Sequence, residues 1–110
     1  MSKLIDTIAT RYDETVPREI EVPEWGTSVF FRPLTPSERS NIRKGINPKD
    51  DEELMISLLV AKALDADGNR LFDDDAKTRA TLMGKGDLAV IARIVQDITA
   101  GAQAGEAKNS

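Results

Sequence analysis

The stretch DEELMISLLVAKALD, residues 51–65, decides what kind of fold this chain can form. Its apolar residues fall on two helical stripes that together cover most of a helix circumference: Leu54, Leu58 and Ala61 on one, and Ile56, Val60 and Ala63 on the other. A helix that is apolar nearly all round usually lies in the core of a domain. The run is short and broken by Lys62, so it does not fit a membrane span. The sequence therefore predicts a central helix on which other elements pack.

The next segment, LDADGNRLFDDDAKT (residues 64–78), carries five aspartates and is the first candidate for chemistry. A helix-loop-helix calcium site starting at Asp65 needs glycine at its sixth position and glutamate at its twelfth. Those positions hold Arg70 and Ala76. The adjacent aspartates 73–75 point in different directions in any regular structure, so they do not converge on one ion. We expect no metal site and no catalytic carboxylate cluster in this segment.

A turn explains the same residues better. Asp65 and Asn69 are of the type that bonds its own backbone, and Gly68 tolerates the positive φ that such a turn needs. Residues 71–72, Leu and Phe, would then dock into the core, and one aspartate of residues 73–75 would cap the next helix. The segment is thus predicted to be a helix end, a turn, an apolar anchor and a helix start.

Two further helices are expected beyond this turn. A short one follows the aspartates and ends at Gly84 or Gly86, and Asp87 caps the last one. The last helix has an apolar stripe at helical spacing, made of Leu88, Ile91, Ala92, Val95 and Ile98. Residues 101–110, GAQAGEAKNS, are small and polar and are expected to form a flexible C-terminal tail.

On the N-terminal side of the central helix, LTPSERSNIRKG carries a helix start. Thr35 is a good N-cap, Pro36 suits the first helical position, and Glu38 completes a capping box. This helix should end near Gly45.

A β-hairpin is expected still earlier, in REIEVPEWGTSVFFRP (residues 18–33). Ile20 and Val22 alternate with glutamates, which is the pattern of a half-buried strand. The VPEWG segment supplies the turn, with Gly26 at positive φ. In the return strand, Val29 and Phe31 face one way and Phe30 faces the other.

The first segment, SKLIDTIATRYDE, predicts an amphipathic helix of about three turns, because Leu4, Ile5, Ile8, Ala9 and Tyr12 share one stripe. Together these elements predict an α+β fold that is mainly α, with four to five helices and one β-hairpin near the N-terminus. Residues 1–100 are expected to form a single small domain, and residues 101–110 the tail.

The composition of the chain limits the classes of function that it can have. The 110 residues include no cysteine and no histidine, which removes disulfides, thiolate metal ligands and the commonest general base. The net charge of −4 disfavours a nucleic-acid surface. Asp6 lies where a secretion signal needs an apolar run, so none is expected. We expect a protein that is not an enzyme, has no cofactor, and binds neither nucleic acid nor membrane.

The order of motifs resembles the tail assembly chaperone family of long-tailed bacteriophages, in its short, non-frameshifted form. Members often carry a strand followed by R-x-L-T-x-x-E-R, and then an alanine-rich helix that runs into D-x-D-G-x-x-L-F before two short helices. The matching residues are Arg32, Leu34, Thr35, Glu38 and Arg39, and then Asp65, Asp67, Gly68, Leu71 and Phe72. The resemblance covers most of residues 18–100.

The resemblance implies a role in the cytoplasm of the infected bacterial host. Such chaperones bind the tape measure protein, keep it soluble, help tail tube subunits to assemble on it, and are absent from the mature virion. The tail tube protein is recruited mainly by a longer form, made by ribosomal frameshift near the end of the short form. Ala107, Lys108 and Asn109 are compatible with a slippery codon run.

The candidate partner-binding residues lie on the stripe of the first helix, at the hairpin tip and on the odd face of its second strand: Leu4, Ile5, Ile8, Tyr12, Trp25 and Phe30. Each of them would alternatively complete the core. Self-association is a further expectation, since the edge strands of the hairpin can pair between copies. The rival functions are a structural phage component such as a head–tail joining protein, a small DNA-binding regulator around Arg39, Arg43 and Lys44, and a metal-dependent enzyme.

Overall fold

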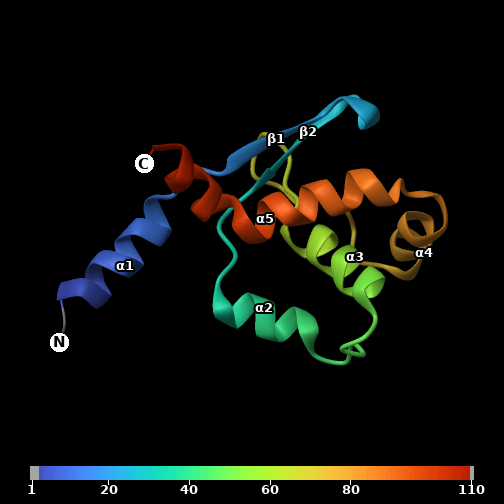
Figure 1. The fold of residues 1–110 in the computed structure, drawn as a ribbon, viewed down its shortest axis with the longest axis horizontal. Helices are drawn as coiled ribbons and strands as arrows, with labels where there is room; N and C mark the ends of the chain where they lie inside the picture. Colours follow the sequence, from blue (N-terminus) through green and yellow to red (C-terminus); the bar gives the residue numbers. More distant parts are fainter. Residues whose placement is uncertain (1–2, 110) are drawn as a thin grey trace.

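The computed structural model describes the backbone of residues 3–109 and the side chains of residues 3–100. These residues form five α-helices, one short 3-10 helix and one two-stranded antiparallel hairpin, which confirms the mainly helical α+β fold (Figure 1). The elements are α1 (Lys3–Glu14), β1 (Arg18–Val22), η1 (Pro23–Trp25), β2 (Thr27–Phe31), α2 (Pro36–Arg43), α3 (Asp51–Lys62), α4 (Ala76–Lys85) and α5 (Leu88–Asn109).

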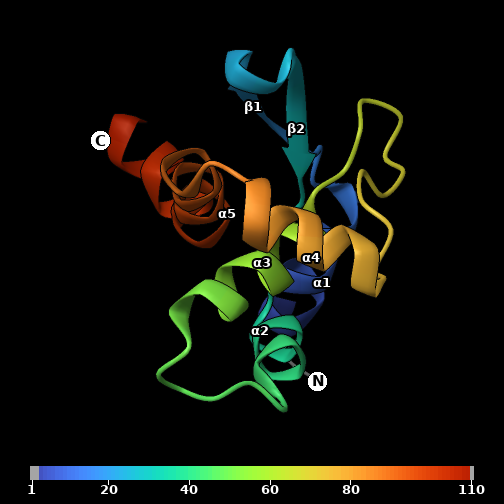
Figure 2. The ribbon, with the colours of Figure 1, turned by 90° about the vertical axis from the view of Figure 1, so that its right-hand side faces the viewer.

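Helix α3 is the centre of the molecule, as its sequence predicts. It packs against α2, α4 and α5, and an end-on view shows α5 to one side and the hairpin above (Figure 2). All five residues of 56–60 are buried, so every face of this part of the helix is covered. One expectation is wrong: Ala61 is exposed, and Lys62 takes a buried position instead.

The hairpin lays its alternating apolar residues on the core. Ile20 pairs with Val29, and Arg18 with Phe31, in an antiparallel register. Ile20, Val29 and Phe31 are buried, whereas Phe30 lies on the other face and is half-buried. The turn is a single 3-10 turn closed by Gly26, whose φ of 67° is the positive value expected of it.

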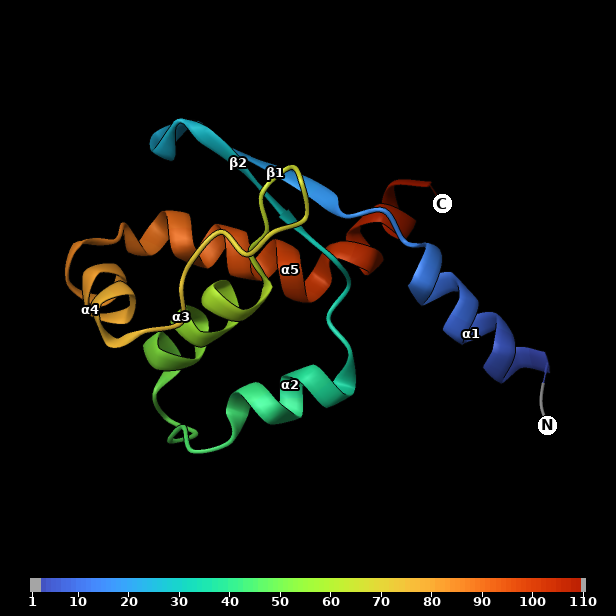
Figure 3. The same ribbon diagram turned by 180° about the vertical axis from the view of Figure 1, so that it is seen from behind.

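Helix α3 ends three residues earlier than the periodicity of its sequence suggests. Ala63 is extended, and its carbonyl accepts a hydrogen bond of 3.0 Å from the Leu71 N–H. Leu64 exchanges two backbone hydrogen bonds, of 2.7 and 2.9 Å, with Phe30 of β2. The chain leaves the helix here because these extended partners satisfy its backbone groups. The same pairing covers part of the free edge of β2 (Figure 3).

The aspartate segment is a turn. One carboxylate oxygen of Asp65 accepts hydrogen bonds from the N–H groups of Asp67 and Asn69, at 2.9 and 3.0 Å. Gly68 has a φ of 86°, the conformation predicted for it. Leu71 and Phe72 are half-buried and pack against the core, as expected.

The helix starts also follow the sequence. The Thr35 hydroxyl accepts from the Glu38 N–H, and the Glu38 carboxylate accepts from the Thr35 N–H, so the capping box is complete. Asp75 is the aspartate that caps α4, since its carboxylate accepts from the Thr78 N–H at 2.8 Å. Gly86 ends that helix.

The buried face of α5 overlaps the predicted stripe but is rotated from it. Ile91, Val95 and Ile98 are buried as expected, but Leu88 is 58% exposed. Ile94 is fully buried, and Val90 nearly so, although neither was assigned to the stripe.

Helix α5 also continues to Asn109, through most of the segment predicted to be a tail. Ser110 lies outside the described residues. The flexibility of residues 101–110 stays a prediction.

Helix α1 lies apart from the rest of the molecule. It projects from the end opposite α4 (Figures 1 and 3) and contributes to a longest dimension of 47 Å. None of its described residues is buried. The predicted three-turn helix is confirmed, and its stripe does not face the core.

Candidate functional site

The exposed face of α1 is the first part of the candidate site. Leu4, Ile5 and Ile8 are 65%, 55% and 55% exposed. Large aliphatic side chains on one helical stripe normally pack against something, because leaving them in water forgoes about 1.5–3 kcal/mol for each. Val16, just beyond the helix, is 78% exposed, although its isolated position in the sequence gave no signal. We refer to Leu4, Ile5 and Ile8 as the α1 stripe.

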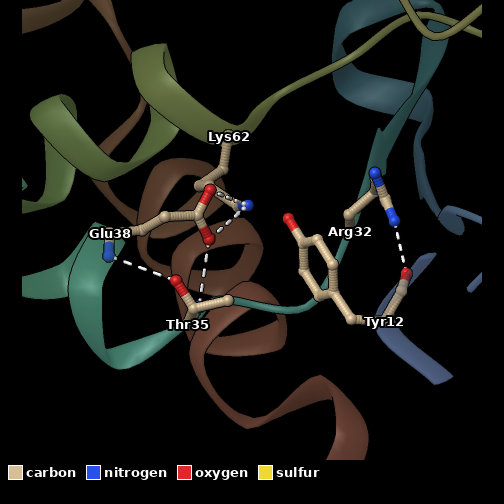
Figure 4. Close-up of polar contacts among 5 residues, drawn as sticks. All are labelled: Tyr12, Arg32, Thr35, Glu38 and Lys62. Carbon is tan, nitrogen blue, oxygen red and sulfur yellow. Dashed lines mark hydrogen bonds and ion pairs between the residues drawn. The ribbon is translucent and has the colours of Figure 1, made fainter. Parts of the chain in front are cut away.

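Tyr12 attaches the base of α1 to the hairpin. The guanidinium of Arg32 lies 4.4 Å from the centre of the Tyr12 ring, and one of its terminal nitrogens donates to the Tyr12 carbonyl (Figure 4). A cation over an aromatic face contributes about 0.5–2 kcal/mol. Tyr12 is therefore half-buried and holds the helix in place, while the α1 stripe above it stays open. Arg32 was part of a sequence motif, but nothing in the sequence pointed to this partner.

Beside this contact lies a second polar cluster, in which Glu38 pairs with Lys62 (Figure 4). The Lys62 ammonium lies 3.0 Å from both carboxylate oxygens of Glu38. The Lys62 side chain is only 8% exposed, whereas that of Glu38 is 35% exposed. The Glu38 carboxylate thus completes the capping box of α2 and also neutralises the one lysine within the core helix. A lysine inside an apolar run was the only sequence signal of this pair.

The environment of Glu38 lowers its pKa. Burial acts to raise it, but the hydrogen bond from the Thr35 N–H and the hydrogen bond and charge of Lys62 outweigh burial. The pKa of Glu38 in the folded protein is therefore below the ordinary value of 4.5. A carboxyl group with a depressed pKa stabilises the fold above its unfolded-state pKa, and this contribution is lost as the pH falls through the folded-state pKa.

Replacing Glu38 with glutamine is expected to lower the free energy of unfolding at pH 7 and to make that free energy less sensitive to a fall in pH. Glutamine can still cap α2, but it leaves the Lys62 ammonium without a carboxylate, at a cost of about 1–2 kcal/mol at pH 7. Below about pH 4.5, the unfolding free energy should fall less steeply in Glu38→Gln than in the unmodified protein. Urea denaturation between pH 7 and pH 3 measures both effects. The exposed Glu21→Gln is the matched control; equal pH profiles for Glu38→Gln and the unmodified protein would contradict this account.

Trp25 lies at the hairpin tip, where it packs rather than protrudes. It is half-buried against the core and meets Phe72 edge to face, with ring centres 6.2 Å apart at 86°. Next to it, Glu24 accepts two hydrogen bonds from Arg93 of α5, at 2.9 and 3.0 Å. These hydrogen bonds lower the pKa of Glu24 to about 2. The tip is thereby fastened to α5.

The six predicted partner-binding residues do not form one surface. Leu4, Ile5 and Ile8 lie together on α1, and Tyr12 lies at its base. Trp25 joins the core at the hairpin tip, and Phe30 is half-buried beside Leu64. Among these six residues, only the three of the α1 stripe lie together on an exposed surface, so the α1 stripe is the candidate contact surface.

The described residues do not meet the requirements of two other kinds of site. Residues 3–100 contain no group of three or more acidic side chains placed to hold a metal ion. No described helix combines the length and the apolar character that crossing a membrane requires. No protein-family model, curated protein or solved structure matches the chain.

Proposed function

We propose that the chain is a tail assembly chaperone of a long-tailed bacteriophage. It binds the tape measure protein, keeps it soluble and helps tail tube subunits to assemble on it in the cytoplasm of the infected host. It acts as a binding protein, without catalysis or a cofactor, and is absent from the mature virion. The observation that carries this proposal is the α1 stripe, exposed on a helix that projects from the domain.

The physical properties of α1 suit a long helical client. An amphipathic helix binds another helix by packing its apolar stripe into a matching face. One copy offers only a few large side chains, so a single contact is weak. A long client with repeated apolar faces binds many copies, and the net charge of −4 on each keeps the complex dispersed.

The tail tube protein is assigned to a second contact. In this proposal it is recruited mainly by a frameshifted longer form, whose additional domain would follow Ala107–Lys108–Asn109. The short form then covers the client, and the longer form brings tube subunits to it.

Adding charge to the α1 stripe should release the client. Ile5→Asp combined with Ile8→Asp replaces two exposed isoleucines, each worth about 1.5–3 kcal/mol when buried in a complex. We expect affinity for the tape measure protein to fall by on the order of 100-fold or more. Co-expression of both proteins, followed by centrifugation and measurement of the soluble tape measure protein, tests this directly.

The control is Thr10→Asp, which adds a charge to the face of α1 opposite the stripe. This variant should keep the client soluble, and both variants should retain the thermal midpoint of the parent. The proposal fails if the stripe and control variants hold the client equally well. Recovery of the chain in fixed copy number from purified virions would instead assign it to the structural components, such as a head–tail joining protein.

A further inference from the structure

A groove on the domain has the properties of a second contact surface. It lies between α2, α3 and α5 and has a volume of about 920 Å³. Its apolar lining comes from Leu34, Pro36, Leu54, Met55, Leu58 and Val95. Three of these are only half-buried, so the groove presents accessible apolar surface rather than a closed core. An apolar floor of this kind suits the stripe of an amphipathic helix.

The α2 side of this groove is basic, and its α3 side carries Asp51. Arg39 and Arg43 lie one turn apart on α2, and both are exposed. Neither takes part in an ion pair with a carboxylate among the described side chains. Two guanidinium groups beside an apolar floor favour a helix whose stripe is flanked by carboxylates.

Helix α1 has one flank of that kind. On the Ile5 side of the stripe lie Asp6 and Asp13, which are seven residues apart and so share one side of the helix, whereas the other flank carries Arg11. Both carboxylates are exposed, and no ion pair is formed by either in the described part of the chain. The charge of this helix flank and the charge of the α2 side of the groove are therefore complementary.

The helix and the groove of one molecule do not meet. Arg32 holds the base of α1 at Tyr12, and from there the helix points away from the body (Figures 1 and 3). We propose that the groove binds α1 of a second copy of this chain. The two surfaces differ, so the contact is heterologous and each copy can bind two neighbours. This contact does not depend on the identity of the client, but it uses the same α1 stripe.

Self-association tests the proposal in its simplest form. Sedimentation equilibrium should show a mean mass that rises with concentration above the 12.1 kDa of one chain. Ile8→Asp should weaken the association by about tenfold or more, whereas Thr81→Asp, at an exposed position on α4, should leave it unchanged. A chain that stays monomeric up to about millimolar concentration would overturn the proposal, whether its α1 remains extended or folds onto its own groove.

Charge reversal identifies the surfaces. One variant carries Asp6→Lys and Asp13→Lys, and the other carries Arg39→Glu and Arg43→Glu; all four positions are exposed, so the fold should persist. Each variant alone should associate about tenfold more weakly, and raised salt should weaken the parent. Mixing the two variants should restore association, because each α1 then meets a groove of opposite charge. The assignment would be overturned if both variants lost association and mixing did not restore it. It would also be overturned if neither variant changed the association, and that result would favour pairing of hairpin edges.

Discussion

Ile94→Ala is expected to lower the free energy of unfolding by about 3–4 kcal/mol. Ile94 lies on α5, is fully buried, and belongs to the cluster that α5 shares with α3 and the hairpin. Removing its outer atoms leaves a cavity that rigid neighbours on several elements cannot fill. Urea denaturation at neutral pH, followed by circular dichroism, gives the value.

The control for this substitution is Leu88→Ala on the same helix. Leu88 fits the apolar periodicity of the sequence at least as well, yet it is 58% exposed. Its truncation should change the unfolding free energy by less than about 1 kcal/mol. If Leu88→Ala proved as damaging as Ile94→Ala, the rotation of α5 described above would be wrong.

Gly86→Ala is expected to destabilise the fold by about 2–3 kcal/mol. The backbone of Gly86 is in a conformation that alanine tolerates, so the effect comes from space alone. A Cβ atom there would lie 2.5 Å from the Leu82 carbonyl oxygen and 2.7 Å from the Ile91 Cδ1 atom. The Leu82 carbonyl cannot move freely, because it accepts the hydrogen bond from the Gly86 N–H that ends α4. Thermal and urea denaturation both report the loss.

Gly84→Ala should act in the opposite direction. Gly84 lies within α4, and a Cβ atom there would meet nothing within 4 Å. Alanine is the better helix former by about 0.5–1 kcal/mol, so a small gain in stability is expected. Two glycine-to-alanine changes two residues apart should therefore have opposite signs. A shared sign would show that the close approach at Gly86 is not the decisive feature.

Local elements of this fold could be predicted because their causes are local. Thr35 and Glu38 cap the same helix start whatever surrounds them, and the turn at Asp65 closes on its own backbone. The alternation of Ile20 and Val22 with glutamates placed the hairpin face correctly. The α1 stripe could be recognised as apolar, but spacing alone does not say whether such a stripe faces the core or solvent.

The sequence by itself determined the central helix, the capped helix starts, the hairpin and the turns, since each depends on residues within a few positions of one another. The tertiary structure decided which face of α5 is buried, because both Leu88 and Ile94 lie on apolar stripes and only packing against α3 chooses between them. It also decided that α3 ends at Lys62. Just beyond this residue Leu64 pairs with Phe30 of the hairpin, and the Lys62 ammonium itself binds Glu38. Such partners are distant in the chain, and their contact energy exists only once the chain has folded.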